Sequence, residues 1–502
     1  MKKNAVSVLC ALLLCALMPF LPSCLIVVNR PAEMTTETQT TPAATSENTG
    51  VNPPTEKLSA DEKASQALQS MVGYDMNGKT IVLATADSSV PKPSGTSTLI
   101  DGARWKVLNE VQDKYGISLL VTADKPADMP QKLKDAKTAG LYYADILLLE
   151  SGSFAEFFAD GLVADLSQMP FLTLDSEYYY PSSVASASVD GKVYGIAGEA
   201  GINPDVFRCL YVNDGLVQSL GLSDLCETVR QGAWTLDAML SASKRAGSSD
   251  IACTGILSEY DEETVSLTFF EGCGVQYVDN RAGKMTFYSP VGAPQTLVAG
   301  MRELFSGGQY GCVLTEEEKK NFYDEELGEY YEPTEYELFC GRRSLFFFGS
   351  VYDARRFRNA QDEMIPLPVP KISEEQLTYV TPTVGSAMLF AIPEGSESTA
   401  EASLLIEALN VRAAGCLSEA YLNTYFYSFS RNERSVEMLS IILDVPYFDL
   451  AVNLNARYPL LAAGTTQTIL QAITTGEDLL DVHFRNYYGA LGALETIRND
   501  AY

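Results

Sequence analysis

Histidine is almost absent from the chain, because His483, near the C-terminus, is the only one in 502 residues. A Ser-His-Asp site or a histidine-rich metal site is therefore not expected, and His483 is better explained as a packing or surface residue. The G-x-S-x-G pattern of many hydrolases is missing. No spacing singles out the pair of carboxylates that glycoside hydrolysis requires. The sequence therefore predicts a protein that is not an enzyme, with no metal and no cofactor.

Basic residues are also scarce, with 36 Lys and Arg against 65 Asp and Glu and a formal net charge of −29. Binding to a phosphate backbone needs basic patches, so nucleic acid is excluded as a partner. An acidic surface mainly aids solubility and does not identify a ligand. The intensely acidic, tyrosine-rich stretch 315–337 is explained most simply as a solvated helix or loop, with no regular calcium-loop spacing.

The ten cysteines show no C-x-x-C spacing, which argues against a zinc site or a redox motif. Three of them lie in the first 24 residues. The other seven are an odd number, and several stand in apolar surroundings that suit small buried hydrophobic residues. One disulfide, between Cys253 and Cys273, is left open by the sequence.

The chain begins with a predicted export signal, residues 1–24, in which two lysines precede an apolar run and the small residues before Cys24. Such a cysteine resembles the acylated first residue of a mature bacterial lipoprotein. Pro22 is unusual in that position, and a plain signal peptide with an incidental cysteine is the alternative. Lipid on Cys24 predicts anchoring to the outer face of a bacterial cytoplasmic membrane, at the cell surface. The apolar run is too short for a comfortable membrane span, and no second long run follows.

The composition changes after the signal and again at about residue 58. Residues 25–58 are rich in Thr, Pro and Glu and bury too little apolar surface to fold, so they form a predicted disordered tether. The remainder is longer than one core normally covers, which predicts two lobes. We expect four segments: the first lobe, the second lobe, a return to the first, and a C-terminal helical segment mostly in the second (59–200, 201–380, 381–430 and 431–502).

Strand and helix patterns alternate in the first lobe, which predicts an α/β fold. The apolar segment 79–86 is a predicted strand that ends at Asp87 and Ser88. A continuous apolar strand at 144–149 ends in the same way at Glu150 and Ser151. Parallel strands deliver polar loops at their carboxyl ends, so these four residues are candidates for a shared site.

The stretch 190–213 organises the prediction, because two strand-like pieces flank the Gly-rich turn 198–201. The glycines let the backbone bend where a side chain would clash. We expect the chain to leave one lobe here, pass Glu199 and enter the other. An ordinary hairpin with a surface turn is the alternative for this stretch alone.

The order of several motifs resembles the extracellular solute-binding proteins of ABC importers, in the broad family 1 group that commonly handles oligosaccharides. The resemblance spans residues 75–481, and each motif alone is weak. Beside the export signal, the tether and the strand before Glu150, the matching segments are GLVADL (161–166) with the downstream Asp175 and Tyr178–Tyr180, GKVYGI (191–196), YVND (211–214) leading to GL (221–222), GAWTLD (232–237), GRRSLFFFG (341–349), PLPVPK (366–371) and RNERSVEML (431–439).

This resemblance implies an α/β, two-lobe periplasmic-binding-protein-like fold with a hinge and an interlobe cleft, in which a small solute is enclosed. In such relatives the ligand contacts come from loops after particular strands and from the first crossing between the lobes. The corresponding ligand-binding residues of this chain are Asp87, Ser88, Glu150, Ser151, Glu199, Ser350 and Tyr352. Thr383 and Ser386 are weaker candidates.

The function implied is a lipid-anchored substrate-binding component that captures a solute, expected to be an oligosaccharide, and delivers it to a membrane permease. Its partners would be the saccharide and the ABC permease, and the protein would act as a monomer. A surface glycan-processing enzyme, or a sensor or adhesion lipoprotein with the same fold, is the alternative.

Overall fold

The computed structural model describes residues 58–502 except 88–89, 250–253, 281–284, 312–315, 321, 325–327, 431 and 502. The export signal, Cys24, nearly all of the tether, and Ser88 lie outside the described residues. Residues 58–502 form a unit separate from the first 57 residues. No helix in this described part is long and apolar enough to cross a membrane.

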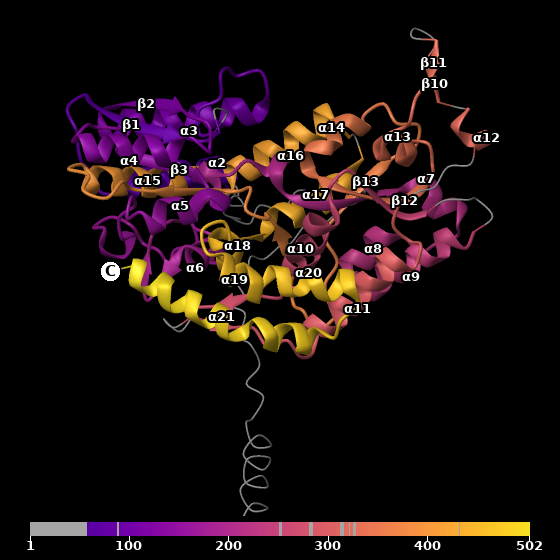
Figure 1. Cartoon of the computed structure of the whole chain (residues 1–502). Coiled ribbons are helices and arrows are strands. Elements are labelled where there is room, and N and C mark those ends of the chain that lie inside the picture. Colours follow the sequence, from indigo (N-terminus) through magenta and orange to yellow (C-terminus); the bar gives the residue numbers. More distant parts are fainter. Residues whose placement is uncertain are drawn as a thin grey trace, which may run out of the picture. The chain divides into compact units, whose positions relative to one another are not determined.

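One four-stranded sheet carries the N-terminal part of the fold, in the order β15-β3-β1-β2. Its first three strands along the chain run parallel, and β15 joins β3 in the antiparallel sense. The orange α15 lies among the indigo and violet elements of this sheet, so distant parts of the chain pack side by side (Figure 1). The bounds are β1 Lys79–Thr85, β2 Ile117–Ala123, β3 Ile146–Glu150, β15 Met388–Ala391, α2 Ala60–Ser70, α3 Leu99–Tyr115, α4 Met129–Ala139, α5 Phe154–Ala159, α6 Pro181–Ser186 and α15 Thr399–Ala413.

A second four-stranded sheet, in the order β13-β6-β12-β7, forms the core of the other lobe. In it β7 runs parallel to β12, and β6 runs antiparallel to both of its neighbours. All seven residues of β12 are buried, as expected for a central strand covered on both faces. The bounds are β6 Arg208–Asn213, β7 Thr254–Ser258, β12 Ser344–Ser350, β13 Met364–Leu367, α7 Asp214–Ser219, α8 Leu225–Arg230, α9 Leu236–Gly247, α10 Glu262–Gly272, α11 Ala293–Ser306, α13 Glu335–Cys340 and α14 Ala354–Phe357.

Three segments of the described chain lead from one sheet to the other before the C-terminal helices. The first pass runs from Ile196, which bridges to Phe390 of β15, to the start of β6. The second leads from β13 back to β15. The third separates α16 (Cys416–Ser428), which packs on α3, from α17 (Glu433–Asp444), which packs on β13. Two lobes joined by several backbone passes are what hinge motion requires.

The C-terminal helices contact both lobes. The helix α18 (Leu450–Leu454) packs on α5 and α6, whereas α20 (Thr466–Thr475) packs on α11. Both α19 (Pro459–Gly464) and α20 pack against α21 (Leu479–Asp500). Lys192 and Tyr194 donate hydrogen bonds to the carbonyl of Ala501, at distances of 2.7 and 3.0 Å, and so attach the end of α21 to the first lobe.

Local sequence signals account for several helix starts and buried side chains. Ser59 and Glu62 form the capping box that opens α2. Thr235 caps α9, and the fully buried Trp234 donates through Nε1 to the carbonyl of Pro368 at 2.8 Å, which makes it a packing residue. His483 is buried against Tyr288.

Of the possible Cys253–Cys273 disulfide, the structure describes one partner. Cys273 is a free, buried thiol, with its sulfur 3.6 Å from the carbonyl oxygen of Pro370. Cys253 lies outside the described residues. Burial raises the pKa of the Cys273 thiol, as expected for an inert core cysteine.

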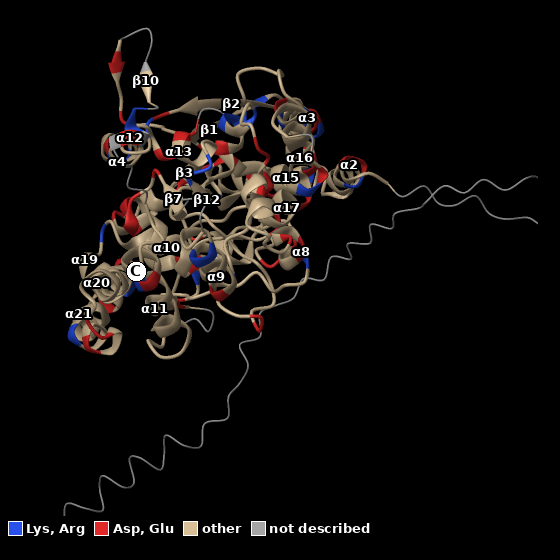
Figure 2. Cartoon of the chain, turned by 90° about the vertical axis from the view of Figure 1, so that its right-hand side faces the viewer, with Lys and Arg blue, Asp and Glu red and all other residues tan. Residues whose placement is uncertain are grey.

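Acidic and basic side chains are interspersed along the ribbons of the described part rather than segregated (Figure 2). Acidic residues flank the hairpin of β10 (Tyr323–Asp324) and β11 (Glu329–Tyr330), which extends from the rest of the second lobe (Figure 1). Part of the predicted acidic stretch around this hairpin lies outside the described residues.

Candidate ligand-binding site

Two predicted carboxylates meet at one edge of the first sheet. Asp87 follows β1 and Glu150 ends β3, and these strands are parallel neighbours. Burial, and next the negative charge of Asp87, raise the pKa of Glu150 above its ordinary value. Among the described residues the Glu150 carboxylate has neither a hydrogen-bond donor nor an ion-pair partner. It is thus a half-buried acceptor that a ligand hydroxyl could use.

The first pass between the lobes connects this edge to the second lobe. Asn203 donates through Nδ2 to Asp87 Oδ2 at 3.2 Å, and its Oδ1 accepts from the amide of Asp205 at the same distance. Asp205 in turn accepts from Arg355 Nη2 at 2.7 Å. It also accepts from the hydroxyl of Tyr421, a buried residue of α16. Polar contacts therefore run without a break from one lobe to the other.

An aromatic group completes the site on the second lobe. Tyr352 follows β12 directly, in the 3-10 turn Val351–Asp353, and 51% of its surface is exposed. The Arg355 guanidinium lies 4.8 Å from the ring centroid of Tyr352 and 5.4 Å from that of Phe429. Although burial alone lowers it, the charge of Asp205 raises the pKa of Arg355 above its ordinary value. An exposed ring held in this way suits stacking on the apolar face of a sugar.

We name these residues the interlobe cluster: Asp87, Glu150, Asn203, Asp205, Tyr352 and Arg355. Arg104 on α3 belongs to its electrostatic surroundings and donates through Nη2 to the carbonyl of Ile202 at 3.2 Å. Burial lowers the pKa of Arg104, and the charges of Asp101, Asp87 and Asp205 oppose this shift. The carboxylates of the cluster thus stand in a field that is partly balanced by cations.

In this structure Glu199 caps a helix. Its carboxylate accepts from the amides of Gly415 at 2.9 Å and Ser418 at 3.2 Å, and so caps the N-terminus of α16. It borders a small cavity of about 20 Å³, enough for one water molecule and far too small for a sugar. The glycines around it are required by space, since a Cβ at Gly201 would lie 2.7 Å from the Phe390 ring.

The predicted serines are turned to the backbone or buried. Ser350 forms a capping box with Asp353, in which its amide donates to Asp353 Oδ2 at 2.8 Å. Ser151 is fully buried, and its hydroxyl has no hydrogen-bond partner among the residues that the structure describes. Thr383 is buried and donates to the carbonyl of Tyr447 at 2.8 Å. The structure thus places Asp87 and Glu150 at one sheet edge and links Asp87 to Tyr352 through Asn203, Asp205 and Arg355. It gives Ser350 and Glu199 capping roles.

Three members of the cluster were not predicted from the sequence. Asn203 and Asp205 flank a proline just beyond the Gly-rich turn, and polar residues at such a turn were a usable signal. Arg355 left no signal, because its partner Asp205 is 150 positions away in the sequence.

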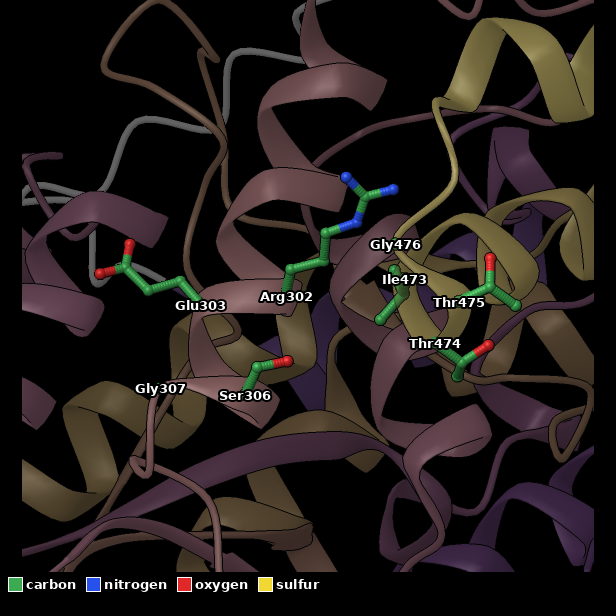
Figure 3. A pocket seen from close by; sticks show the side chains of 8 residues that line it. All are labelled: Arg302, Glu303, Ser306, Gly307, Ile473, Thr474, Thr475 and Gly476. Carbon is green, nitrogen blue, oxygen red and sulfur yellow. The ribbon is translucent and has the colours of Figure 1, made fainter.

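A hollow with a volume of about 510 Å³ lies elsewhere in the described part. It is open and lies between the C-terminal ends of α11 and α20 (Figure 3). Arg302 donates through Nε to the carbonyl of Ala472 at 2.8 Å, and Glu303 is paired with Lys244. The hydroxyls of Thr474 and Thr475 donate to carbonyls of their own helix. Since these polar groups are already satisfied, the interlobe cluster is the better candidate site.

No protein-family model and no curated protein sequence matches the chain. Solved structures do match. The galacto-N-biose-/lacto-N-biose I-binding protein of the ABC transporter from Bifidobacterium longum, in complex with lacto-N-biose, gives a TM-score of 0.54 at 13% identity, covering 84% of this chain and 98% of that one. The sugar-binding protein MalE from Xanthomonas citri gives 0.53 at 12% identity, with the same coverage of both chains.

An extracellular solute-binding protein from Staphylococcus aureus in complex with maltose gives a TM-score of 0.53 at 11% identity, covering 83% of this chain and 98% of that one. The chain has the two-lobe fold of the periplasmic binding proteins. This confirms the predicted fold class. The similar structures are binding proteins rather than enzymes. Within the described residues, no group of three or more metal-ligating side chains is found.

Proposed function

We propose that the protein is the substrate-binding component of an ABC importer and that it captures a saccharide between its lobes. The observation that carries this proposal is the interlobe cluster, which joins both sheet edges through Asn203, Asp205 and Arg355. The fold supports it, because binding-protein lobes of this kind close around a ligand at their hinge.

The chemistry of the cluster suits a sugar. Glu150 and Asp87 can each accept hydrogen bonds from hydroxyls, and charge makes such bonds stronger than neutral ones. Tyr352 offers an exposed face to the C–H surface of a pyranose ring. Carboxylates on one lobe and an aromatic ring on the other mean that full contact requires both lobes.

Anchoring and delivery are further parts of the proposal. Lipid on Cys24 would hold the mature protein at the outer face of the cytoplasmic membrane. Residues 25–58 would act as a flexible linker between the lipid and the folded domain. From there the loaded monomer would dock on a membrane permease. Palmitate labelling of wild-type protein and a Cys24→Ser variant tests the anchor, since the variant should be released into the medium.

The binding function is tested with the secreted domain, residues 58–502, in a thermal-shift screen over saccharides, peptides and polyamines. A ligand that binds the native state raises the unfolding temperature by mass action. We expect saccharides to produce the shifts, and isothermal titration with Tyr352→Ala to show weakened binding. Tyr488→Ala is the matched control, because Tyr488 is 81% exposed on α21. Shifts from peptides or polyamines alone would contradict the proposal.

The same samples separate binding from catalysis. Mass spectrometry after long incubation should recover each saccharide unchanged. A hydrolysed or rearranged product would favour a glycan-processing enzyme in place of a transport component.

A further inference from the structure

Arg208 lies at the same edge of the second sheet as Tyr352 and Arg355. It is the first residue of β6 and pairs in register with Ser350, the last residue of β12. Tyr260 follows the end of β7, which runs parallel to β12, so it reaches this edge as well. The amide of Val351, next to Tyr352, donates to the carbonyl of Phe207, next to Arg208, at 2.9 Å. Arg208 therefore belongs to the face that the second lobe contributes to the site.

The guanidinium of Arg208 is held in a fixed orientation by Tyr260. Its central carbon lies 4.3 Å from the centroid of the Tyr260 ring. Tyr260 is itself anchored, since its amide donates to Ser258 Oγ at 3.0 Å and its carbonyl accepts from the hydroxyl of Tyr310 at 3.3 Å. Its ring also packs edge-on against Phe348. The stacked cation is thus preorganised.

Arg208 has no acceptor for its donors among the described residues. Its Nε is buried without a hydrogen-bond partner, and its guanidinium forms no ion pair. The neighbouring Arg355 and Arg356 differ, because they pair with Asp205 and with Glu259. A buried donor without an acceptor is costly, so a group that supplies acceptor oxygens here would be bound strongly.

The charge of Arg208 acts on one buried carboxyl, that of Glu271, but the two side chains are not hydrogen-bonded. Glu271 on α10 is fully buried, and burial, followed by the charge of Asp449, raises its pKa well above the ordinary value. Its Oε2 accepts from the amide of Val384 at 3.3 Å, and no hydrogen bond joins it to Arg208. Neither hydrogen bond nor ion pair to Glu271 therefore occupies the donors of Arg208.

We propose that Arg208, stacked on Tyr260, is the anion subsite of the interlobe site and that the ligand is an acidic saccharide. The group it takes is an oxyanion, the carboxylate of a uronic acid or a phosphate ester. The planar guanidinium donates two parallel hydrogen bonds to such a group, whereas a single hydroxyl can accept only part of this fork. This inference rests on the proposed saccharide function and names the class of saccharide.

The test measures binding of matched ligands to the secreted domain by isothermal titration. The uronate arm compares digalacturonate with galactobiose, and the phosphate arm compares glucose 1-phosphate with glucose. We expect an acidic member to bind at least about tenfold more tightly than its neutral counterpart. The arm that shows the difference identifies the oxyanion.

Two variants assign the preference to one side chain. Arg208→Gln should remove the acid preference, so that the ratio of affinities for the acidic and the neutral member falls to about one. Arg208→Lys keeps the charge without the fork and should retain part of the preference. Arg245→Gln, an exposed arginine of α9, is the control.

The outcomes separate this inference from the function it rests on. Equal affinity for acidic and neutral members in the wild type would overturn the anion subsite and leave a saccharide-binding protein. If Arg208→Gln still prefers the acidic member, Arg208 is not the anion subsite and the proposal is wrong. Binding of no saccharide in any arm would overturn both. If Arg208→Gln does not fold, the wild-type ratio and Arg208→Lys still decide.

Discussion

Replacing Tyr352 by alanine should weaken saccharide binding without unfolding the protein. A tyrosine buries roughly 150–250 Å² when fully covered, and about half of this ring is exposed in the free protein. A ligand can thus cover on the order of 100 Å², which at about 25 cal/mol per Å² is about 2.5 kcal/mol, or about 70-fold in Kd. Because association also orders the ring, we expect a loss of at least about tenfold.

Fold stability should change little in this variant. Arg355 keeps its ion pair with Asp205 and its contact with Phe429 when the Tyr352 ring is removed. Titration of the tightest saccharide from the screen, together with a thermal melt of each ligand-free variant, measures both effects. Tyr352→Phe keeps the ring and should stay within about threefold of wild type. Wild-type affinity in Tyr352→Ala would show that the ring is not part of the site.

Three further predictions concern stability, each measured by denaturant unfolding. Glu199→Ala should lose about 1–2 kcal/mol, because two amides of α16 lose their cap, whereas exposed Glu397→Ala should lose nothing. Arg412→Leu tests whether the buried Arg412, which pairs with the partly exposed Glu110 of α3 and Asp61 of α2, stabilises α15; we expect a loss of about 1–3 kcal/mol, and a gain would show that apolar packing replaces the ion pairs. Burial raises the pKa of Asp449 from 3.8 to about 6. Between these pH values the folded state therefore binds more protons than the unfolded state. The contribution of Asp449 to the free energy of unfolding accordingly falls as the pH rises through this window. Asp449→Asn, which still caps α18, should therefore gain on the order of 3 kcal/mol over wild type between pH 4 and pH 7; a constant difference would refute the assignment.

Local signals predicted most of the first lobe. The alternation of apolar strands and amphipathic helices between residues 79 and 150 was enough to place β1, β2 and β3, because each pattern is satisfied within a few residues. The Ser59 capping box and the Thr235 cap were readable for the same reason. Asp87 and Glu150 came together because the carboxyl ends of parallel neighbours share an edge.

The rest of the site could not be predicted in the same way, because its contacts join distant positions. The Asp205–Arg355 pair depends on how the two lobes pack, which no short pattern records. The serine candidates show a different difficulty, since a polar residue after a strand can bind a ligand or cap the next turn. In one case the sequence held the answer: Ser350 and Asp353 have the spacing of a capping box.

A crystal structure of residues 58–502 with the tightest saccharide from the screen tests the central claim most directly. We predict the sugar between the lobes, with Glu150 accepting from a hydroxyl and the Tyr352 ring against a pyranose face. A saccharide that occupies the hollow between α11 and α20, or that contacts one lobe alone, would contradict it.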